Sequence, residues 1–342
     1  MILVTGGTGM LGSHLLMRLV QNEPMVRATK RKHSSLQVVE NLFHFFYPEE
    51  AKTLLNKIEW VDADLKDTYQ LAKALHNVDT VYHTAAIVSF RRKDEIDMIV
   101  NNREGTANLL DLSIEAGVKK FCHVSSVAAL EKVEDKKYTD EENYWKTEKA
   151  KHAYGISKFQ SEMEVWRAKE MGLPIVIVNP SIILGPGTWQ SGSSQFFSSV
   201  AEEMYFYTEG GTGFVDVLDC VDAMISLVST HWEAANGKRF VLNSDNLAYK
   251  DLFTRIAKEI NTQAPKWKIS RRGITIAYWF ESILSMLMRR QPKITKSTIN
   301  SATNRSYYSG KLITETIPFT YRSIDEAIKR VAKQFLWEHQ NR

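Results

Sequence analysis

The first half of the chain alternates short apolar, β-branched runs with longer segments in which apolar residues recur every three or four positions. The short runs have the length of buried strands, and the longer segments have helical periodicity. This alternation is typical of βαβ units around a parallel sheet. The predicted strands are Ile2–Val4, Met25–Thr29, Ile58–Asp62, Thr80–His83, Lys120–Val124 and Ile175–Asn179. The predicted helices are Met10–Gln21, Thr68–Leu75, Asn102–Ala116 and Lys149–Met171.

The regularity ends near Pro180. Beyond it, glycine- and serine-rich loops separate single helices, which we expect at Asp219–Thr230 and Tyr249–Ile260. We therefore predict an α/β fold in which residues 1–180 form a doubly wound parallel sheet that carries the chemistry. Residues 181–342 would form mainly a smaller α/β region that binds substrate, with some segments packing back on the first half.

The composition is that of an ordinary globular protein. The 44 Lys and Arg residues against 40 Asp and Glu residues give a formal charge of +4 over 342 residues. The basic pairs are scattered without a nucleic-acid-binding motif, so we expect no nucleic-acid partner. The two cysteines, Cys122 and Cys220, have no Cys/His cluster at ligand spacing, which favours a reducing, cytoplasmic compartment and no structural metal.

Neither a targeting segment nor a membrane span is expected. Met1 leads directly into the first strand, without the basic and small-residue regions of a signal peptide. The most apolar later stretch, Ile274–Met288, contains Glu281 and is shorter than the roughly 20 residues that cross a bilayer. We expect it to form a helix that covers a core or a pocket, with a peripheral membrane contact as the alternative.

A glycine-rich turn connects the first predicted strand to the first predicted helix. Backbone N–H groups and the positive end of the helix dipole at such a turn bind the pyrophosphate of a dinucleotide. Gly6 or Gly7 would permit the turn, Gly9 would let the phosphate approach, and Gly12 would let the helix pack closely on the sheet. The spacing fits both the GxGxxG and the GxxGxxG pattern. The predicted phosphate-binding residues are Thr5, Gly6, Gly7, Thr8, Gly9, Met10, Leu11 and Gly12.

The end of the second strand distinguishes the two nicotinamide cofactors. NAD-binding sites usually place a carboxylate there, on the ribose 2′-hydroxyl. Here Arg27–Lys32 contains no acid, and its cations suit the 2′-phosphate of NADP(H). We therefore favour NADP(H) over NAD(H), with Arg31 as the first ligand and Lys30 as the second; a solvated loop is the alternative. Asp64, after the third strand, would accept from the adenine amino group or cap a helix.

A tyrosine and a lysine mark a candidate catalytic helix. Tyr154 and Lys158 lie four positions apart and therefore on one helix face. An ammonium group beside a phenol lowers the tyrosine pKa from about 10, which suits general acid/base chemistry at neutral pH. Ser125 and Ser126 follow the fifth strand, at the carboxyl edge of the sheet, where ligands bind. A serine hydroxyl there can donate to a substrate carbonyl oxygen.

In this order the motifs resemble the extended short-chain dehydrogenase/reductases, the superfamily of NAD-dependent epimerases and dehydratases, whose cofactor half is a Rossmann fold. The resemblance covers nearly the whole chain. Besides the segments above, it includes Asp64–Leu65, His83–Ala86, Asn102–Thr106, Asn179–Ser181, Gly185–Gly187 and Phe214–Asp219.

The resemblance implies a role for each site residue. Tyr154 would be the general acid/base, and Lys158 would also bind the nicotinamide ribose. Ser126 would polarise the substrate carbonyl, with Ser125 packing beside it. Asn102 matches the family's asparagine that supports a proton-relay water, and a side chain bonded to the backbone is an equal alternative. The further cofactor contacts that the resemblance implies are Leu65, Thr84, Ala85, Ala86, Ser125, Pro180 and Ile182.

The resemblance also bears on residues outside the reaction. His14 and His83 stand where the family often has histidine, and we interpret both as structural. Family members often form homodimers through the helix that carries the tyrosine and lysine. Val165, Trp166 and Ala168 suit such a dimer face, and packing within the chain explains them equally.

Within the family, the chain looks like the dihydroflavonol 4-reductase, cinnamoyl-CoA reductase and 3β-hydroxysteroid dehydrogenase group. The features that carry this likeness are Arg31, the serine pair and the segment Tyr307–Lys311. Sugar-nucleotide enzymes usually have an arginine just before the segment that begins here at Phe214, and this chain has glycine and threonine there. Asn179 stands where many relatives have arginine. A buried pyrophosphate without cationic partners is costly, so a nucleotide sugar is disfavoured.

The expected function is NADP(H)-dependent reduction of a ketone or an aldehyde of a small apolar or aromatic substrate. One alternative is a sugar-nucleotide epimerase or dehydratase that retains NAD. Another is a non-catalytic NADP-sensing protein, against which the intact set of Ser126, Tyr154 and Lys158 argues. The aromatic residues that suit a flat substrate, each of them also a candidate for the core, are Trp189, Phe196, Phe197, Tyr205, Phe206, Tyr207, Tyr278 and Trp279.

Overall fold

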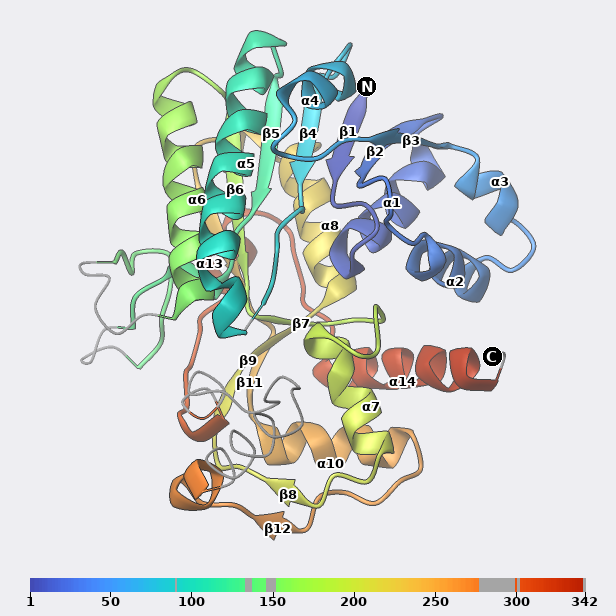
Figure 1. The fold of residues 1–342 in the computed structure, drawn as a ribbon, viewed down its shortest axis with the longest axis vertical. Helices are drawn as coiled ribbons and strands as arrows, with labels where there is room; N and C mark the ends of the chain where they lie inside the picture. Colours follow the sequence, from blue (N-terminus) through green and yellow to red (C-terminus); the bar gives the residue numbers. More distant parts are fainter. Residues whose placement is uncertain (90, 133–136, 146–151, 277–298, 300–301, 341–342) are drawn as a thin grey trace.

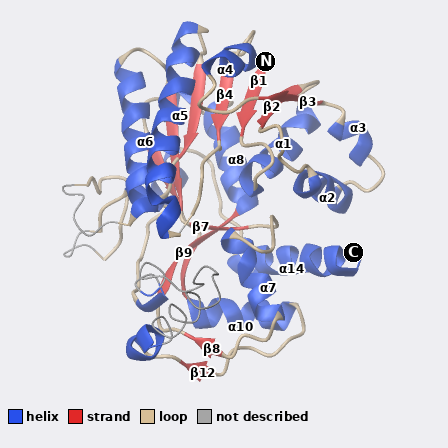
Figure 2. Cartoon of the chain, in the orientation of Figure 1, coloured by secondary structure: helices blue, strands red, loops and turns tan. Residues whose placement is uncertain are grey.

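The computed structural model describes residues 1–89, 91–132, 137–145, 152–276, 299 and 302–340. Figure 1 shows a large sheet with helices on both faces in the upper part of the view, and a smaller region of helices and short strands below it. Figure 2 separates the two kinds of element by colour. The predicted α/β class is confirmed, and so is the doubly wound parallel sheet.

The large sheet has seven strands, all paired in parallel, in the order β10-β6-β5-β4-β1-β2-β3. Leu3 of β1 lies opposite Arg27 of β2 on one side and opposite Val81 of β4 on the other. The strands are β1 (Ile2–Thr5), β2 (Val26–Lys30), β3 (Ile58–Asp62), β4 (Thr80–His83), β5 (Lys120–Val124), β6 (Ile175–Pro180) and β10 (Arg239–Leu242). The six strands predicted from the first half are confirmed to within one residue at each end.

Two apolar layers hold helices against the two faces of this sheet, because successive strand residues point to opposite faces. Val4 belongs to the layer under α1 and α8, whereas its neighbour Leu3 belongs to the layer under α4, α5 and α6. These helices are α1 (Met10–Asn22), α4 (Thr68–Ala74), α5 (Glu95–Glu115), α6 (Ala153–Glu170) and α8 (Val217–Val228). The shorter helices are α2 (Gln37–Phe46), α3 (Ala51–Leu55), α9 (Trp232–Ala235) and α13 (Lys311–Thr316).

Helix α5 begins well before its predicted start at Asn102. Glu95 and Asp97 lie in its first turn, where carboxylates favour the positive end of the helix dipole. Gly117 follows the last turn with a φ of 70°, a conformation that glycine adopts readily and that ends the helix.

Helix α6 begins at Ala153. His152 caps it by accepting a hydrogen bond from the Gly155 N–H at 2.9 Å. The predicted start at Lys149 lies outside the described residues.

The smaller region surrounds a three-stranded sheet in the order β11-β9-β7. Its apolar cluster contains Trp189, Phe197 and Phe335. Strands β8 and β12 form a separate parallel pair. The elements are β7 (Ile182–Leu184), α7 (Gln195–Ala201), β8 (Phe206–Tyr207), β9 (Gly211–Asp216), β11 (Asp245–Ala248), α10 (Tyr249–Glu259), β12 (Trp267–Lys268) and α14 (Ile324–Gln340).

Segments from beyond Pro180 also build the large sheet. Strand β10 pairs with β6 at the sheet edge, and α8 packs on a sheet face. Of the apolar stretch Ile274–Met288, residues 274–276 are helical and the rest lies outside the described residues. No helix among the described residues has the length and apolar character needed to span a bilayer.

Buried and half-buried ion pairs attach α14 and the segment before it to α8. Asp216 caps the N-terminus of α8 and is fully buried, and Arg330 of α14 donates to both of its oxygens, with Nη1 to Oδ2 at 2.7 Å. Arg322 donates to Asp219 at 2.5 Å and to Asp222 at 2.6 Å. The C-terminal segment is therefore held to the large sheet through α8.

The variant Arg330→Met removes the cation that pairs with the buried carboxylate of Asp216. We expect the free energy of unfolding to fall by about 3 to 5 kcal/mol, because an unpaired charge stays buried. Arg255→Met is the matched control: Arg255 pairs with exposed Asp325 at 3.1 Å, so its loss should be under about 1 kcal/mol. Denaturant unfolding followed by circular dichroism measures both, and equal losses would contradict the assignment.

Candidate active site

The glycine turn after β1 is closed by backbone contacts that leave no room for side chains. Gly6 has a φ of 72°, and the Gly9 N–H donates to its carbonyl oxygen at 3.0 Å. A Cβ on Gly12 would lie 2.2 Å from the same carbonyl oxygen. The turn and the first turn of α1 are thus in direct contact, as the predicted role of Gly12 requires.

The N-terminus of α1 suits an anionic group. Gly9 is its capping residue, no side chain caps it, and its first turn contains no acidic residue. The free N–H groups and the helix dipole therefore have no anionic partner in the part of the chain that the structure describes. This donor set fits a pyrophosphate.

The two predicted cations at the end of β2 differ in their surroundings. The Lys30 ammonium pairs with Asp62 at 2.6 Å, whereas the exposed Arg31 side chain has no hydrogen bond or ion pair with any described residue. Asp64 is exposed, and its side chain accepts from the Lys66 N–H at 2.9 Å. The capping residue of α4 is Asp67, so the helix-capping alternative for Asp64 is wrong.

Several of the other expected cofactor contacts gather around the glycine turn. The Thr84 hydroxyl donates to the Thr5 carbonyl oxygen at 2.7 Å, and a Cβ on Gly6 would lie 2.7 Å from the Ala85 backbone. Leu65 packs against the backbone of α5 at Gly105. Pro180 ends β6 and Ile182 begins β7, and no direct contact of these two with the turn is described.

The three predicted catalytic side chains meet where β5 ends against α6. The hydroxyl group of Ser126 lies close enough to that of Tyr154 to lower the tyrosine pKa. The Lys158 ammonium, one helical turn beyond Tyr154, donates to the Val124 carbonyl oxygen at 3.0 Å and is 6% exposed. Two hydroxyl groups that can donate to one carbonyl oxygen thus lie side by side, with a buried cation beneath them.

The pKa of Tyr154 shifts in the direction opposite to the one predicted from its spacing with Lys158. Burial raises the pKa of Tyr154 above its usual range, and the nearby Ser126 hydroxyl opposes that shift. The expected lowering by Lys158 is absent, because the ammonium bonds to the backbone of β5 instead. Burial lowers the pKa of Lys158 to about 8, and the charge of Glu162 opposes that shift.

Asn102 is bound to the backbone. Its Oδ1 accepts from the Ile87 N–H at 2.7 Å, and its Nδ2 donates to the Ile87 carbonyl oxygen at 2.9 Å and reaches Ser157 Oγ at 3.3 Å. The sequence left open whether Asn102 supports a relay water or bonds to the backbone, and in the structure it bonds to the backbone. It fixes the loop after β4 beside α6.

A buried glutamate that the sequence analysis does not single out lies directly behind the site. Glu162 accepts from the Ser125 hydroxyl at 2.6 Å and from Asn179 Nδ2 at 2.9 Å. It also pairs with Arg239 of β10 at 3.0 Å. Ser125 therefore faces Glu162 while Ser126 faces Tyr154. The sequence does carry one indication of this role, because Glu162 lies one helical turn after Lys158 and therefore on the same face of the helix.

The two histidines are buried within the fold. His83 bonds to Thr5 at 2.7 Å and to Thr106 at 3.0 Å, and His14 bonds to the Met10 carbonyl oxygen at 2.7 Å. Burial lowers the pKa of His83 to about 3 and that of His14 to about 4. Both are neutral at physiological pH, in keeping with a structural role.

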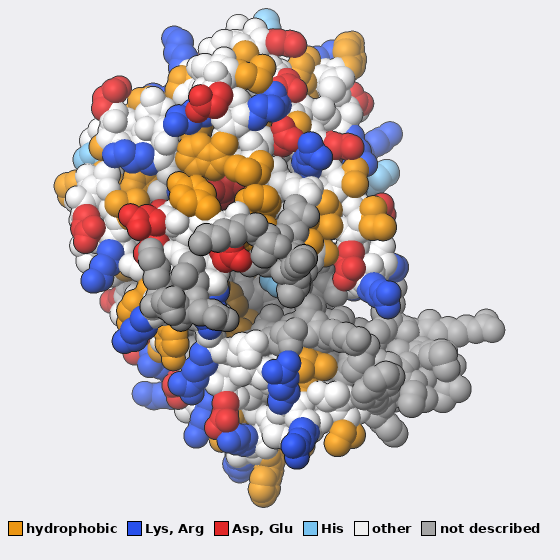
Figure 3. Space-filling view, turned by 90° about the vertical axis from the view of Figure 1, so that its left-hand side faces the viewer, with side chains coloured by type: hydrophobic (Ala, Val, Ile, Leu, Met, Phe, Trp, Pro, Cys, Tyr) orange, Lys and Arg blue, Asp and Glu red, His pale blue; other side chains and the backbone are white. Residues whose placement is uncertain are grey.

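The residues expected at a dimer face largely serve the core. Val165 and Ala168 of α6 are fully buried in the apolar layer between this helix and the sheet, and Trp166 packs against the same layer. Figure 3, which faces the α6 side, shows hydrophobic side chains gathered on its upper half. A homodimer stays a prediction.

The aromatic residues after Ser181 do not form one surface. Trp189 and Phe197 belong to the core, whereas Tyr205 and Phe206 are exposed. Tyr278 and Trp279 lie outside the described residues. These aromatic residues, taken as a set, therefore do not support the prediction of a flat substrate.

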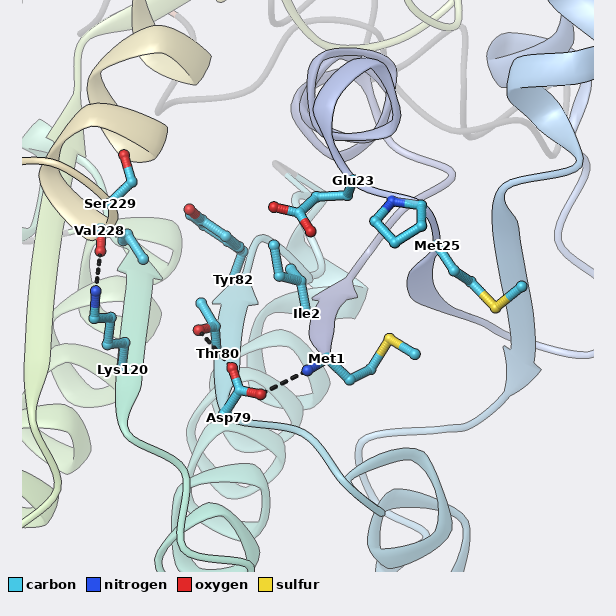
Figure 4. A pocket seen from close by; sticks show the side chains of 11 residues that line it. Met1, Ile2, Glu23, Met25, Asp79, Thr80, Tyr82, Lys120, Val228 and Ser229 are labelled. Carbon is cyan, nitrogen blue, oxygen red and sulfur yellow. Dashed lines mark hydrogen bonds and ion pairs between the residues drawn. The ribbon is translucent and has the colours of Figure 1, made fainter.

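A cavity of about 440 Å³ lies elsewhere, at the amino ends of β1 and β4 (Figure 4). Met1, Asp79 and Tyr82 contribute to its wall. Because β1 and β4 are parallel, this is the sheet edge opposite the glycine turn. It is separate from the site described above.

Comparisons with known proteins agree with this geometry. The family model described as "NAD dependent epimerase/dehydratase family" matches residues 2–242. A Synechocystis sp. protein named "Putative dihydroflavonol 4-reductase" is 27% identical over 331 residues, which are 95% of this chain and 91% of that protein. The crystal structure of gox2253 is 26% identical, with a TM-score of 0.79 and 98% of each chain covered. UDP-glucose 4-epimerase from Thermotoga maritima, 20% identical with a TM-score of 0.75 and 99% of each chain covered, shares the fold.

Two glycine variants separate the folding role of the turn from its binding role. Gly12→Ala forces a Cβ against the Gly6 carbonyl, so we expect a loss of about 3 kcal/mol in the free energy of unfolding. Gly9→Ala meets only the Gly6 oxygen, at 3.4 Å, and should cost under about 1 kcal/mol. Gly9→Ala should nevertheless weaken NADPH binding at least tenfold, because its methyl group occupies the phosphate approach. Chemical denaturation and cofactor fluorescence measure the two effects; tight binding by Gly9→Ala would contradict the placement.

Proposed function

Because the chain belongs to the NAD dependent epimerase/dehydratase family, we propose that it is an NADP(H)-dependent reductase of a ketone or an aldehyde. The family and the reductase relative support an NAD(P)-dependent oxidoreductase as the general class. The observation that carries the specific proposal is the position of Ser126 beside Tyr154, with the buried Lys158 one helical turn further along α6.

The residues of the cofactor half fit a dinucleotide with a 2′-phosphate. The glycine turn and the N-terminus of α1 would hold the pyrophosphate, and Arg31 would pair with the 2′-phosphate. Lys30 is the weaker ligand, because Asp62 already neutralises it. When bound, the reduced cofactor supplies a hydride to the carbonyl carbon.

The protein's own part in the reaction is to bind and protonate the carbonyl oxygen. Ser126 and Tyr154 donate hydrogen bonds to that oxygen, and Tyr154 gives up its proton as negative charge develops there. The raised pKa of Tyr154 keeps the phenol protonated until then. Lys158 lies one helical turn away on the same face of α6. Its ammonium, which bonds to the Val124 carbonyl oxygen while Tyr154 is protonated, would turn to the phenolate once that charge has formed and stabilise it there.

The surroundings of the site favour an apolar substrate over a nucleotide sugar. Ile87 is 37% exposed and Val88 is 56% exposed on the loop after β4, beside Asn102. Before Phe214, a Cβ on Gly213 would lie 2.0 Å from Asn243 Oδ1, so that position cannot hold an arginine for a pyrophosphate. We propose a carbonyl compound whose body is apolar.

The variant Tyr154→Phe tests the general acid. Its fold and its NADPH binding should match those of the wild type, whereas turnover should fall by about 10²- to 10⁴-fold, because the proton donor is lost. Tyr138→Phe, which changes an exposed tyrosine, should retain full turnover. Oxidation of NADPH with a panel of apolar aldehydes and ketones is the measurement. Near-normal turnover by Tyr154→Phe would refute the assignment.

The variant Arg31→Ala tests the cofactor preference. We expect it to weaken NADPH binding by about 10- to 100-fold, the value of one charge-assisted hydrogen-bond pair, and to leave NADH binding unchanged. Lys32→Ala removes the adjacent exposed cation and should have a smaller effect. The measurement is the dissociation constant of each variant for NADPH and for NADH, from fluorescence titration of the protein with each reduced cofactor. A wild type that binds both equally well would overturn the preference for NADP(H).

A further inference from the structure

The side chain of Glu162 is surrounded by hydrogen-bond donors. It is 2% exposed, and its Oε2 accepts from Ser125 Oγ at 2.6 Å and from Asn179 Nδ2 at 2.9 Å. Its Oε1 accepts from Arg239 Nη1 at 3.0 Å and from Trp166 Nε1 at 3.3 Å. A carboxylate has about four acceptor positions, and these four donors use them. These bonds therefore fix the Glu162 carboxylate in one orientation.

Glu162 shares its helix face with the catalytic lysine. Lys158 and Glu162 lie at i and i+4 of α6, and both are buried. Burial favours the neutral form of a lysine, whereas a nearby anion favours the charged form. Glu162 is the charged group that opposes the effect of burial at Lys158 among the described residues.

Among the residues that the structure describes, the other titratable groups near Lys158 supply no negative charge. His83 of β4 and His123 of β5 are fully buried, and burial lowers the pKa of both, so that they are neutral at physiological pH. Tyr154, on α6 itself, holds its proton. Arg239, from β10, is a cation that also bonds to the Glu141 carbonyl oxygen and lies 4.2 Å from the Tyr144 ring. The charge balance at Lys158 thus depends on one carboxylate.

We propose that Glu162 is a positioning residue of the active site, whose buried carboxylate keeps Lys158 charged in the pH range in which the enzyme works. Arg239 and Ser125 act through it by fixing the carboxylate. The inference rests on the proposed reductase function, because that function requires a charged Lys158. Strand β10, which comes from beyond Pro180, thereby contributes to the chemistry at β5 and α6.

The direct test titrates Lys158 in the full-length protein, without and with NADP⁺, by NMR of ¹³C-labelled lysine side chains. Lys158→Met identifies the signal by its loss. The wild-type midpoint should lie near 8, and in Glu162→Gln it should fall by about one pH unit or more. Glu162→Asp keeps the negative charge, so its Lys158 midpoint should lie close to that of the wild type. An unchanged midpoint in Glu162→Gln would overturn the proposal.

Glu164→Gln is the matched control. It removes a carboxylate from the same helix, but Glu164 pairs with Arg103 and Arg167, and the Lys158 midpoint should not move. Should Glu162→Gln fail to fold by circular dichroism, Arg239→Gln decides instead. Loss of that cation leaves the Glu162 carboxylate without one of its donors and weakens it as an anion, so the Lys158 midpoint should move to lower pH. A midpoint that stays or rises would contradict the proposal.

A kinetic readout separates this inference from the proposed function. In Glu162→Gln the alkaline loss of kcat should begin at lower pH than in the wild type, by the same shift that NMR records. A wild type that reduces no carbonyl substrate would refute the proposed function and leave the NMR titration as the test of Glu162. An active wild type whose alkaline limb is unchanged in Glu162→Gln would refute the inference alone.

Discussion

The parallel pairing of β1 with both β2 and β4 is the constraint from which the site follows. Strand order reverses at β1, so the connections that leave β1 and β4 pass to opposite faces and leave a crevice at their carboxyl ends. The glycine turn can occupy this crevice only because Gly6 and Gly12 have no side chains in contact. The same sheet edge receives the ends of β5 and β6, and with them Ser126 and the helix that carries Tyr154. One edge of one sheet therefore positions both the glycine turn after β1 and the catalytic residues Ser126 and Tyr154, which lie far from it in the sequence.

Features with a local cause were predictable from the sequence, and features that depend on distant partners were not. The strands of the first half, the turn at Gly12 and the end of α5 at Gly117 follow from short patterns. The spacing of Ile324, Ile328 and Val331 likewise carried a signal for α14. Nothing near β10 indicates that it extends the large sheet, because its partner β6 lies far back in the chain. The pairing of Arg239 with Glu162, 77 positions apart, belongs to the same class.

The candidate site shows the same limit in its electrostatics. The spacing of Tyr154 and Lys158 predicts a lowered tyrosine pKa, yet burial acts on both groups and raises the pKa of Tyr154. The spacing of two residues determines whether their side chains share a helix face. How deeply each side chain is buried depends on the other segments that pack against that face. Asn102 is similar, since the pattern names the residue and the loop at Ile87 determines its partner.

A buried catalytic lysine faces two opposed requirements. Exclusion of water strengthens its electrostatic effect on a phenolate, but the same exclusion favours loss of its proton. A fixed anion nearby removes the conflict only if that anion is itself fully bonded, because an unsatisfied buried carboxylate would take up a proton instead. Ser125, Asn179 and Arg239 meet that condition for Glu162, and they come from the end of β5, from β6 and from β10. The sheet therefore maintains the charge of the site as well as its geometry.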